Sequence, residues 1–546
     1  MIKYLIFFCF FSMVYSNDQN HLEIKPEPSI SPKLLSVTDN PDYIDTTHFA
    51  VGNIYSEFTN DGRLGFSFTN NAGTFWPNAN EEIVFEHGFW LIGKTNENTE
   101  NETLVGAVPE FDANYTPGPM INGEAAVLVT PDDVEAYRTY VIDGNSGPGD
   151  DDYDNWPSEW GAPIHSDGTP KLMGDKMAWT IYNDAHPDVH GWLETNDGGE
   201  GNNTFIEVRE TVWGFNDGEY ESDALFYKYQ VFNKGVDTLT NLTISHWNDI
   251  DIMSATWNDW GFNEDQNFGF VYYNNDSANA NLPKAVSYFL IQGPMIPETG
   301  STAHAFGATF ENRTNLNTTA FWGIGDDACS PQNYGGSPSN LIQAYNFTLG
   351  LQYDGSPIVN PITGEETTYT FTGDPVTNEG WVSDDYCHGG MTGYIMSSGP
   401  LTLAPGDSQE VVIGLVGSSE SSVEASLNNL QTRVEYLRDL YYDQLSIQEP
   451  IPIPNDFLTV KHYPNPFNPS VQFEIEMIKE SAIEMTIFNI KGELIWQKKL
   501  GIKERGVHTL SWDAKNLNQE FLAASVYLYR VNAGNHIQTG KVVYVK

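Results

Sequence analysis

Three aspartates stand at alternate positions in GPGDDDYDNWPSEWGAP, a segment rich in glycine and proline. Asp150, Asp152 and Asp154 could direct several carboxylate oxygens at one cation, and Ca²⁺ takes six to eight oxygen ligands. The segment departs from the EF-hand pattern, because Asn155 replaces the required glycine and Gly161 replaces the bidentate glutamate. Two interpretations stay open: a calcium-binding loop and a solvated acidic turn.

A second acidic cluster lies in HWNDIDIMSATWNDWGFNEDQ. Asp249 and Asp251 are two residues apart at the end of a predicted strand, so their side chains face the same way and could share a ligand. Asp259 or Asp265 could fold back onto them across a loop. Calcium is the cofactor that both clusters indicate, and the candidate metal ligands are Asp150, Asp152, Asp154, Asp249, Asp251 and Asp265.

The motifs point to no enzyme class. The sequence contains no G-x-S-x-G elbow, no P-loop and no dinucleotide fingerprint. A carboxylate pair for glycoside hydrolysis stays open, because many pairs could converge among 74 Asp and Glu residues. Four tryptophans in predicted loops could stack on sugars, although tryptophans more often belong to the core: Trp156, Trp160, Trp257 and Trp260.

The amino terminus has the pattern of a secretory signal peptide. One lysine precedes an apolar run from Tyr4 to Val14, and a small-residue cleavage signature follows, so we expect residues 1–16 to be removed. The remaining chain has two cysteines, and in an exported protein such a pair is more often a disulfide than a reactive or metal site. The predicted disulfide joins Cys329 to Cys387, with two unjoined cysteines as the alternative.

The charge excludes some partners. With 74 acidic against 26 basic residues, the chain lacks the basic footprint that nucleic acid requires. The acidic residues are unevenly distributed along the chain, since residues 456–546 include only 9 acidic residues beside 11 basic ones. After the leader, nothing approaches a spanning run of about 18 apolar residues, so we expect a protein that is not transmembrane.

The elements that must position these residues are mostly strands. Residues 17–45 read as an extended linker, and residues 46–445 consist of short apolar or alternating segments separated by turn residues. This pattern predicts an all-β body made of one large or two adjacent β-sandwiches. The strand candidates include 64–68, 83–92, 177–182, 205–215, 225–233, 238–247, 268–273, 285–292 and 409–415.

One helix is predicted at the end of the body, within 420–445. Ser421 and Glu424 form a candidate capping box, and an apolar stripe follows at steps of three and four: Val423, Leu427, Leu430, Val434, Leu437 and Tyr441. We expect this stripe to pack on the sandwich. A proline-rich linker, 446–459, then separates the body from a last domain.

The last domain, 460–546, alternates apolar and polar residues from Val471 to Met477 and continues in short strands, which predicts a small immunoglobulin-like sandwich. It contains, in order, YPNPFNPS, IFNIKGELIW, GVHTLSWDAKNLNQEFLAASVYLYRV and a basic terminal strand. Together these motifs resemble the carboxy-terminal sorting domain of proteins exported by the bacterial type IX secretion system. The related immunoglobulin-like domain of a flagellar hook-capping protein is similar.

The resemblance implies the type IX secretion machinery as a partner, and secretion or the outer cell surface as the destination. Ala514, Gln519 and Ser525 stand where the pattern usually has glycines, which puts the loop shapes in doubt. Around 150–275 the body also resembles a group of large β-rich secreted proteins with the same sorting domain. That likeness brings no catalytic residue with it.

The sequence therefore predicts an exported protein with a binding or structural role and a polysaccharide or cell-surface glycan as a candidate partner. The alternative is a secreted polymer-degrading hydrolase, with a glycoside hydrolase first. A hydrolase needs a deep cleft with two carboxylates roughly 5–10 Å apart, one with a raised pKa. A binding protein would present a shallow aromatic surface instead.

Removal of calcium should destabilise the body if the acidic clusters bind it, because a ligand bound only to the native state raises the stability of that state. Melting curves recorded with excess Ca²⁺ and with a chelator test this expectation. The melting temperature should be lower with the chelator. Coincident curves would exclude calcium as a stabilising ligand.

Overall fold

The computed structural model describes residues 44–65, 73–96, 102–109, 114–121, 123–125, 135–186, 203–252, 257–273, 284–325, 337–383, 393–445, 458–477, 481–491, 493–504, 506–516, 521–533 and 536–545. The predicted signal peptide, the 446–459 linker except its last two residues, and both cysteines of the predicted disulfide, Cys329 and Cys387, lie outside these residues.

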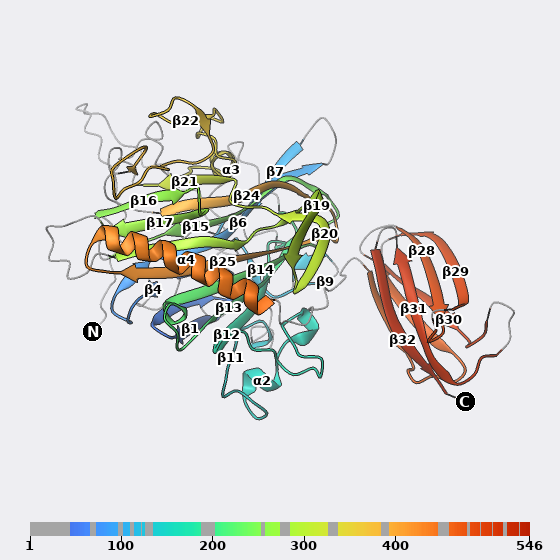
Figure 1. Cartoon of the computed structure of the whole chain (residues 1–546). Coiled ribbons are helices and arrows are strands. Elements are labelled where there is room, and N and C mark those ends of the chain that lie inside the picture. Colours follow the sequence, from blue (N-terminus) through green and yellow to red (C-terminus); the bar gives the residue numbers. More distant parts are fainter. Residues whose placement is uncertain are drawn as a thin grey trace, which may run out of the picture.

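Two large antiparallel sheets form one β-sandwich, which confirms the predicted all-β class (Figure 1). The first sheet has ten strands in the order β21-β24-β15-β6-β3-β2-β4-β5, with β1 beside β2 and β7 beside β6. Its strands are β1 (Thr46–Val51), β2 (Ile54–Thr59), β3 (Arg63–Leu64), β4 (Thr74–Phe75), β5 (Glu82–Val84), β6 (Glu86–Asn96), β7 (Glu102–Ala107), β15 (Leu239–Asp249), β21 (Ala320–Ile324) and β24 (Gly393–Leu403).

The second sheet has nine strands in the order β11-β12-β13-β14-β25-β18-β17-β16, with β8 beside β12. Its strands are β8 (Thr116–Pro117), β11 (Tyr140–Asp143), β12 (Lys176–Asn183), β13 (Ile206–Gly214), β14 (Ala224–Asn233), β16 (Asn258–Asn263), β17 (Phe268–Tyr273), β18 (Lys284–Gln292) and β25 (Ser408–Ser419). Every residue of β13, β14 and β18 is buried, so both faces of this sheet are covered.

Alternate residues of the second sheet serve two different cores. On β14, Tyr227, Tyr229 and Val231 face the first sheet, whereas Phe226 belongs to the core on the other side. Period-two alternation normally separates a core face from a solvent face. Here both faces are buried and both contribute residues to a core, because a further layer covers the outer face.

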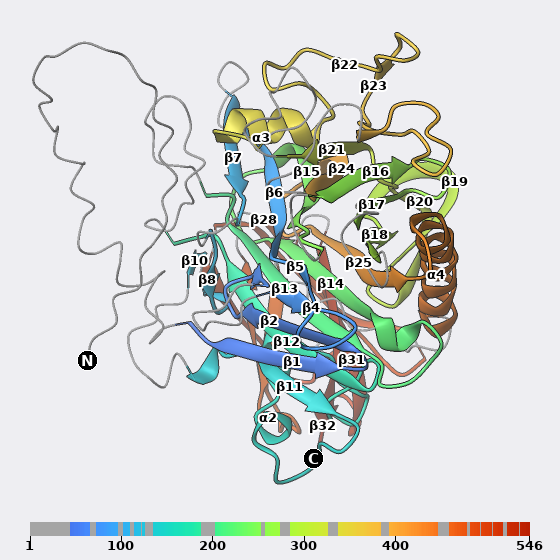
Figure 2. The ribbon, with the colours of Figure 1, turned by 90° about the vertical axis from the view of Figure 1, so that its left-hand side faces the viewer.

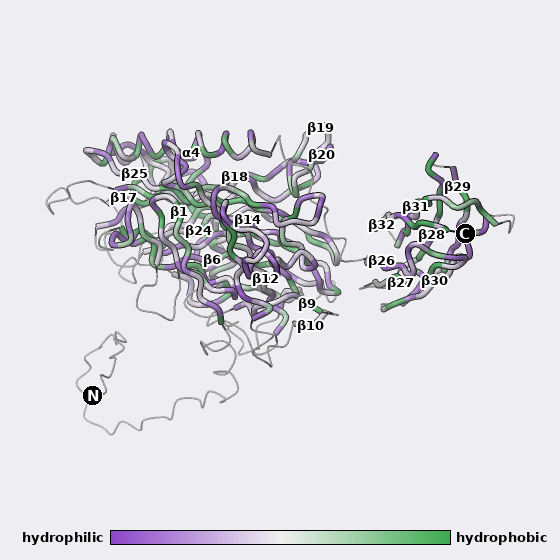
Figure 3. Tube along the Cα trace, turned by 90° about the horizontal axis from the view of Figure 1, so that it is seen from below, coloured by the Kyte–Doolittle hydropathy of each residue, from purple (hydrophilic) through white to green (hydrophobic). Residues whose placement is uncertain are grey.

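That further layer is α4 (Val423–Leu445), which packs against β18, β25 and β17 (Figure 2). Leu430, Val434 and Leu437 are fully buried, and Figure 3 shows how hydrophobic and hydrophilic residues alternate along the helix. The predicted stripe is thus confirmed. The cap differs by one position, because the Oγ of Ser422 accepts the hydrogen bond from the amide of Ala425 at 3.1 Å.

Shorter elements complete the body. α3 (Leu341–Thr348), which the sequence did not predict, packs against β21, β24, β15, β6 and β7. None of the described helices is both long and apolar enough to span a membrane. The remaining elements are α2 (Asp151–Asp154), the 3₁₀ turns Ser158–Trp160 and Glu221–Asp223, and the pairs β9 (Met120–Ile121) with β10 (Glu124–Ala125), β19 (Met295–Ala305) with β20 (Ala308–Asn315), and β22 (Ile358–Val359) with β23 (Glu366–Thr367).

The last domain is a separate small sandwich with its own core. Its sheets have the orders β26-β27-β30 and β29-β28-β31-β32. Ala514, which replaces a glycine of the family pattern, is fully buried and keeps the left-handed backbone that glycine adopts most easily, with φ 49°. The strands are β26 (Leu458–Tyr463), β27 (Val471–Met477), β28 (Ser481–Phe488), β29 (Leu494–Lys503), β30 (Gly506–Trp512), β31 (Ser525–Ala533) and β32 (His536–Tyr544).

The interior between the two large sheets contains titratable side chains. Glu210 on β13 is 1 % exposed, and its Oε2 accepts a hydrogen bond from the Tyr182 hydroxyl at 3.1 Å. Burial raises the pKa of Glu210 to about 8, although the hydrogen bond from Tyr182 and the nearby Tyr229 hydroxyl oppose the shift. The Glu210 carboxyl is therefore mostly protonated at neutral pH.

Replacement of Glu210 by Gln should flatten the dependence of stability on pH. The pKa of this carboxyl is raised in the folded state, so its stabilising contribution is complete below the unfolded pKa and is lost as pH rises through the folded pKa. The free energy of unfolding of the wild type should therefore fall between about pH 5 and about pH 9, by about 1.4 kcal/mol for each pH unit in which only the folded form holds the proton.

Urea unfolding of the wild type and of Glu210→Gln across this range measures the difference. Glu424→Gln, which alters an exposed carboxylate of α4, serves as the control and should keep the wild-type pH dependence. Parallel pH profiles for the wild type and Glu210→Gln would contradict the assignment.

Candidate functional site

The first acidic cluster is held by internal hydrogen bonds in a helical turn rather than an open loop. α2 covers Asp151–Asp154, where Asp152 accepts hydrogen bonds from the Arg138 guanidinium at 2.9 and 3.1 Å and from the amide of Val141. Asp150 accepts from the amide of Gly147, and Asp154 accepts from the amide of Gly149. The three predicted ligands thus have separate partners, which for Asp152 lie in β11 and just before it.

The second cluster is divided in space. Asp249 ends β15 and is buried beside Glu86, its register partner on β6. Asp251 follows in the next loop, whereas Asp265 lies in the turn after β16, at the other end of that strand. Among the described residues, no group of three or more His, Cys, Asp or Glu side chains is arranged to hold a metal ion.

Asp251 instead lies close enough to influence Glu82, which the sequence did not single out. Burial raises the pKa of Asp251 to about 6. Burial, and then the charge of Asp251, raise the pKa of Glu82 to about 7. These two half-buried carboxyls form a pair that binds protons near neutral pH.

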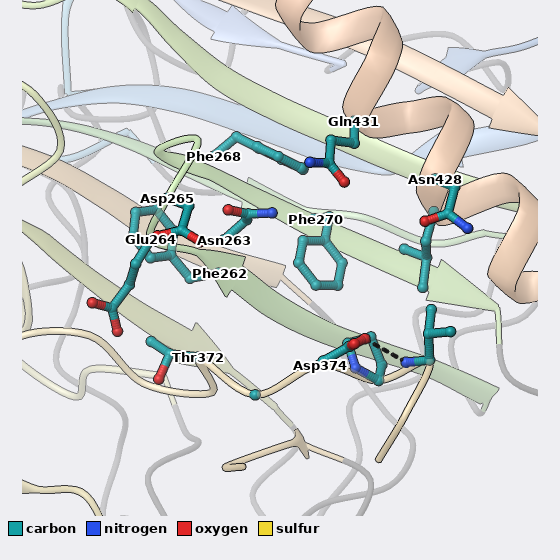
Figure 4. Close-up of a pocket in the computed structure, with 14 residues that line it drawn as sticks. Phe262, Asn263, Glu264, Asp265, Phe268, Phe270, Thr372, Asp374, Asn428 and Gln431 are labelled. Carbon is teal, nitrogen blue, oxygen red and sulfur yellow. Dashed lines mark hydrogen bonds between the residues drawn. The ribbon is translucent and has the colours of Figure 1, made fainter. Parts of the chain in front are cut away.

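A pocket of about 470 Å³ lies between α4, the β16–β17 hairpin and the segment 372–376 (Figure 4). It has an aromatic floor and a polar rim, and it includes Asp265 from the predicted set. The lining residues are Phe262, Asn263, Glu264, Asp265, Phe268, Phe270, Thr372, Gly373, Asp374, Pro375, Val376, Leu427, Asn428 and Gln431.

The floor is made by aromatic rings that are already part of the two cores. Phe268 and Phe270 are 3 % and 6 % exposed and belong to the core beneath α4. Phe262 is 2 % exposed and stacks on Tyr369, with ring centroids 4.9 Å apart and planes at 6°. The floor therefore offers only a small exposed part of each ring.

The rim carries oxygen and amide groups from three segments. Glu264 and Asp265 come from the hairpin turn, and Asn428 and Gln431, three residues apart, come from one face of α4. Asp374 stands on the opposite loop, where one carboxylate oxygen accepts the amide of Val376 at 2.8 Å. In the described part of the chain, no Lys, Arg or His lines this pocket.

α4 also fixes the hairpin turn in place. The guanidinium of Arg438 donates hydrogen bonds to the backbone carbonyls of Gln266 and Asn267, and to that of Leu290 on β18. The Gln266 side chain in turn donates to the Glu435 carboxylate. The acidic part of the rim is thus tied to the helix that supplies the amides.

This arrangement suits a polar ligand that is neutral or positively charged. Carboxylates accept hydrogen bonds, and side-chain amides both donate and accept them, so the rim can bind hydroxyl groups. Three carboxylates without a basic neighbour in the lining repel an anionic ligand.

The tryptophans predicted in loops do not form a common platform. Trp156 and Trp260 are 7 % and 2 % exposed and belong to the cores, and Trp260 lies in β16 rather than in a loop. Trp160 is half-buried, and Trp257 is exposed. The pocket uses phenylalanines of β16 and β17, which the alternation of Phe268 and Phe270 could have indicated.

Comparison with solved structures gives weak similarities. The chain matches FlgD from P. aeruginosa at 15% identity over 14% of this chain and 57% of that chain, with a TM-score of 0.12. It matches a polysaccharide lyase at 7% identity over 92% and 46%, with a TM-score of 0.21. It matches dimeric latent PorU from Porphyromonas gingivalis at 14% identity over 68% and 31%, with a TM-score of 0.16.

The chain thus spans between 31% and 57% of the length of these structures, and at such TM-scores no conclusion about the body rests on them. No curated protein matches the sequence. The model of the family "Secretion system C-terminal sorting domain" matches residues 461–546, which coincide with the small sandwich of β26 to β32. Residues 461–546 are therefore a type IX secretion sorting domain, which marks the protein for export to the cell surface or for secretion.

Proposed function

We propose that the body of this exported protein binds a neutral glycan in the pocket between α4 and the β16–β17 hairpin. The observation that carries the proposal is the composition of the lining, in which amides and carboxylates surround a buried aromatic floor without a basic side chain among the lining residues. Export places this pocket outside the cell, where glycans are accessible.

The size of the pocket supports a ligand of one or a few sugar rings. Its volume of about 470 Å³ lies within the usual range of small-molecule sites. Side-chain amides and carboxylates from three segments could hold several hydroxyls at once, which a single polar residue could not do. The aromatic rings of Phe262 and Phe270 would contact the apolar side of a sugar ring.

A hydrolase is less well supported than a binding protein. Glycoside hydrolysis requires a carboxyl group that remains protonated near neutral pH beside the scissile bond. Among the described residues, the carboxyls with raised pKa values are Asp45, Glu82, Glu210 and Asp251, and none of them lines the pocket. A binding role needs only the rim and the floor.

Loss of the two helix amides should weaken glycan binding. Asn428→Ala and Gln431→Ala each remove a hydrogen-bonding group from the rim, and we expect roughly fivefold weaker binding for each lost hydrogen bond. Calorimetry with neutral oligosaccharides, beside sulfated and uronic counterparts, measures the affinity. The neutral series should bind more tightly.

Asp439→Ala is the matched control, because Asp439 is exposed on α4 and does not line the pocket. It should bind like the wild type. Equal affinity in both pocket variants, or a preference for the anionic series, would contradict the proposal. Release of reducing ends during the titration would favour the hydrolase instead.

Deletion of the sorting domain should stop export at the outer membrane. Without residues 458–546 the protein should accumulate in the periplasm, because the signal for passage across the outer membrane is lost. The body should still fold, because its hydrophobic cores contain no residue of the sorting domain. Fractionation of cells that produce the full chain or the truncated chain, each with the same internal tag, measures the distribution. Equal amounts of both forms outside the cell would show that the export signal lies outside residues 458–546.

A further inference from the structure

Buried polar side chains meet at one place between the two large sheets, and none of them lines the pocket. They come from both sheets: His87 on β6 and His246 on β15 from the first, and Tyr182, Glu210, Tyr227, Tyr229 and Tyr288 on β12, β13, β14 and β18 from the second. Each of these side chains is at most 1 % exposed. We call this set the interior polar cluster.

The members of the interior polar cluster are contiguous. The ring of Tyr288 lies 4.3 Å from that of His246 and 4.8 Å from that of His87, centroid to centroid. Tyr227 lies 5.1 Å from His87, again between centroids. Glu210 and Tyr229 are register partners on β13 and β14, so the histidines connect to the carboxyl through tyrosines.

Several polar atoms of the cluster have no hydrogen-bond partner among the described residues. They are His87 Nε2, His246 Nδ1, Glu210 Oε1 and the hydroxyls of Tyr227, Tyr229 and Tyr288. The Tyr227 hydroxyl lies near those of Ser56 and Tyr288, and the Tyr229 hydroxyl lies near the Glu210 carboxyl, but these hydroxyls do not reach normal hydrogen-bond geometry with the described residues. So many unsatisfied atoms at one place are rare, because buried polar groups almost always find partners.

The histidine pair presents one donor and one acceptor to the cluster. His87 Nδ1 and His246 Nε2 are 3.1 Å apart, so one of them donates its proton to the other. Burial lowers the pKa of His246 to about 3 and that of His87 well below its usual value, so both rings are neutral at neutral pH. Whichever ring donates, one outer nitrogen then carries a hydrogen and the other is bare.

The chemistry of the cluster indicates which kind of ligand it can bind. A neutral imidazole can ligate a metal ion, but among the described residues no group of three or more His, Cys, Asp or Glu side chains is arranged to hold one. The cluster also carries little charge that would hold another kind of ion. A ligand that donates and accepts at several sites within a closed interior is required. Water has this property, and buried water typically makes about three hydrogen bonds to otherwise unsatisfied groups.

We propose that the interior polar cluster is a binding site for a connected group of ordered water molecules, which bridge the Glu210 carboxyl to the His87–His246 pair through the hydroxyls of Tyr227, Tyr229 and Tyr288. The group is part of the folded sandwich and supplies the hydrogen bonds that the two sheets do not supply to each other. It is independent of the proposed glycan pocket.

Two tyrosine variants separate a hydrated cluster from a dry one. In Tyr227→Phe the hydroxyl that holds water is lost, so the melting temperature should fall by a few degrees and magnetic relaxation dispersion should detect at least one long-lived water fewer. Tyr394→Phe is the control, because the Tyr394 hydroxyl already accepts a hydrogen bond from the amide of Tyr288 and has the carbonyls of Gly269 and Tyr288 to donate to. It should lower the melting temperature without changing the number of long-lived waters.

A dry cluster gives the opposite result. If the Tyr227 hydroxyl is simply unsatisfied, Tyr227→Phe removes an unfavourable buried group, so the melting temperature should rise and the relaxation dispersion should stay unchanged. That outcome overturns the proposal. Should Tyr227→Phe fail to fold, a high-resolution crystal structure of the wild type decides: water density among these side chains supports the proposal, and closed direct hydrogen bonds without water overturn it.

Discussion

The nine-stranded sheet must be covered on both faces, and the rest of the body follows from this constraint. Every residue of its central strands β13, β14 and β18 is buried, and apolar or aromatic side chains occur on both faces, so the sheet would expose a wide apolar surface if either face were open. The ten-stranded sheet covers one face, and α4 with the segment around Trp156 covers the other. The pocket lies where this outer cover ends, between α4 and the last hairpin of the sheet.

Titratable groups in the interior follow from the same geometry. A sheet that is buried on both sides has no solvent face for its polar residues, so Glu210, Tyr227 and Tyr229 must be accommodated inside. Buried polar groups stabilise a unique arrangement only when their hydrogen bonds are completed. The strongly acidic composition of the chain is thus confined mainly to loops and to the surface, where carboxylates remain hydrated.

Local patterns in the sequence predicted local structure well. The alternation at 177–182 and 225–233 matches β12 and β14 within one or two residues, and the apolar stripe of α4 is buried as expected. Strands of two residues such as β4 and β8 are missed, because two residues carry no period. The terminal domain was identified from four ordered motifs, and the family match covers the same residues.

The site was much less predictable, because its parts are distant in the sequence. The pocket brings together residues of 262–270, 372–376 and 427–431. Of these, only Asp265 belongs to the site residues that the sequence predicts. Acidic residues close together in the sequence, such as Asp249 and Asp265, are separated by the direction of β16. Which residues become neighbours in space depends on pairing between strands distant in the sequence, such as β14 with β25. The periodicity of a single segment does not predict this pairing.

α4 covers the outer core and forms one wall of the pocket. It is the last described element of the body along the chain. A ribosome therefore delivers every described strand of the body before it delivers this wall. The pocket cannot exist in a partly emerged chain, so its lining is complete only after the whole body has been synthesised.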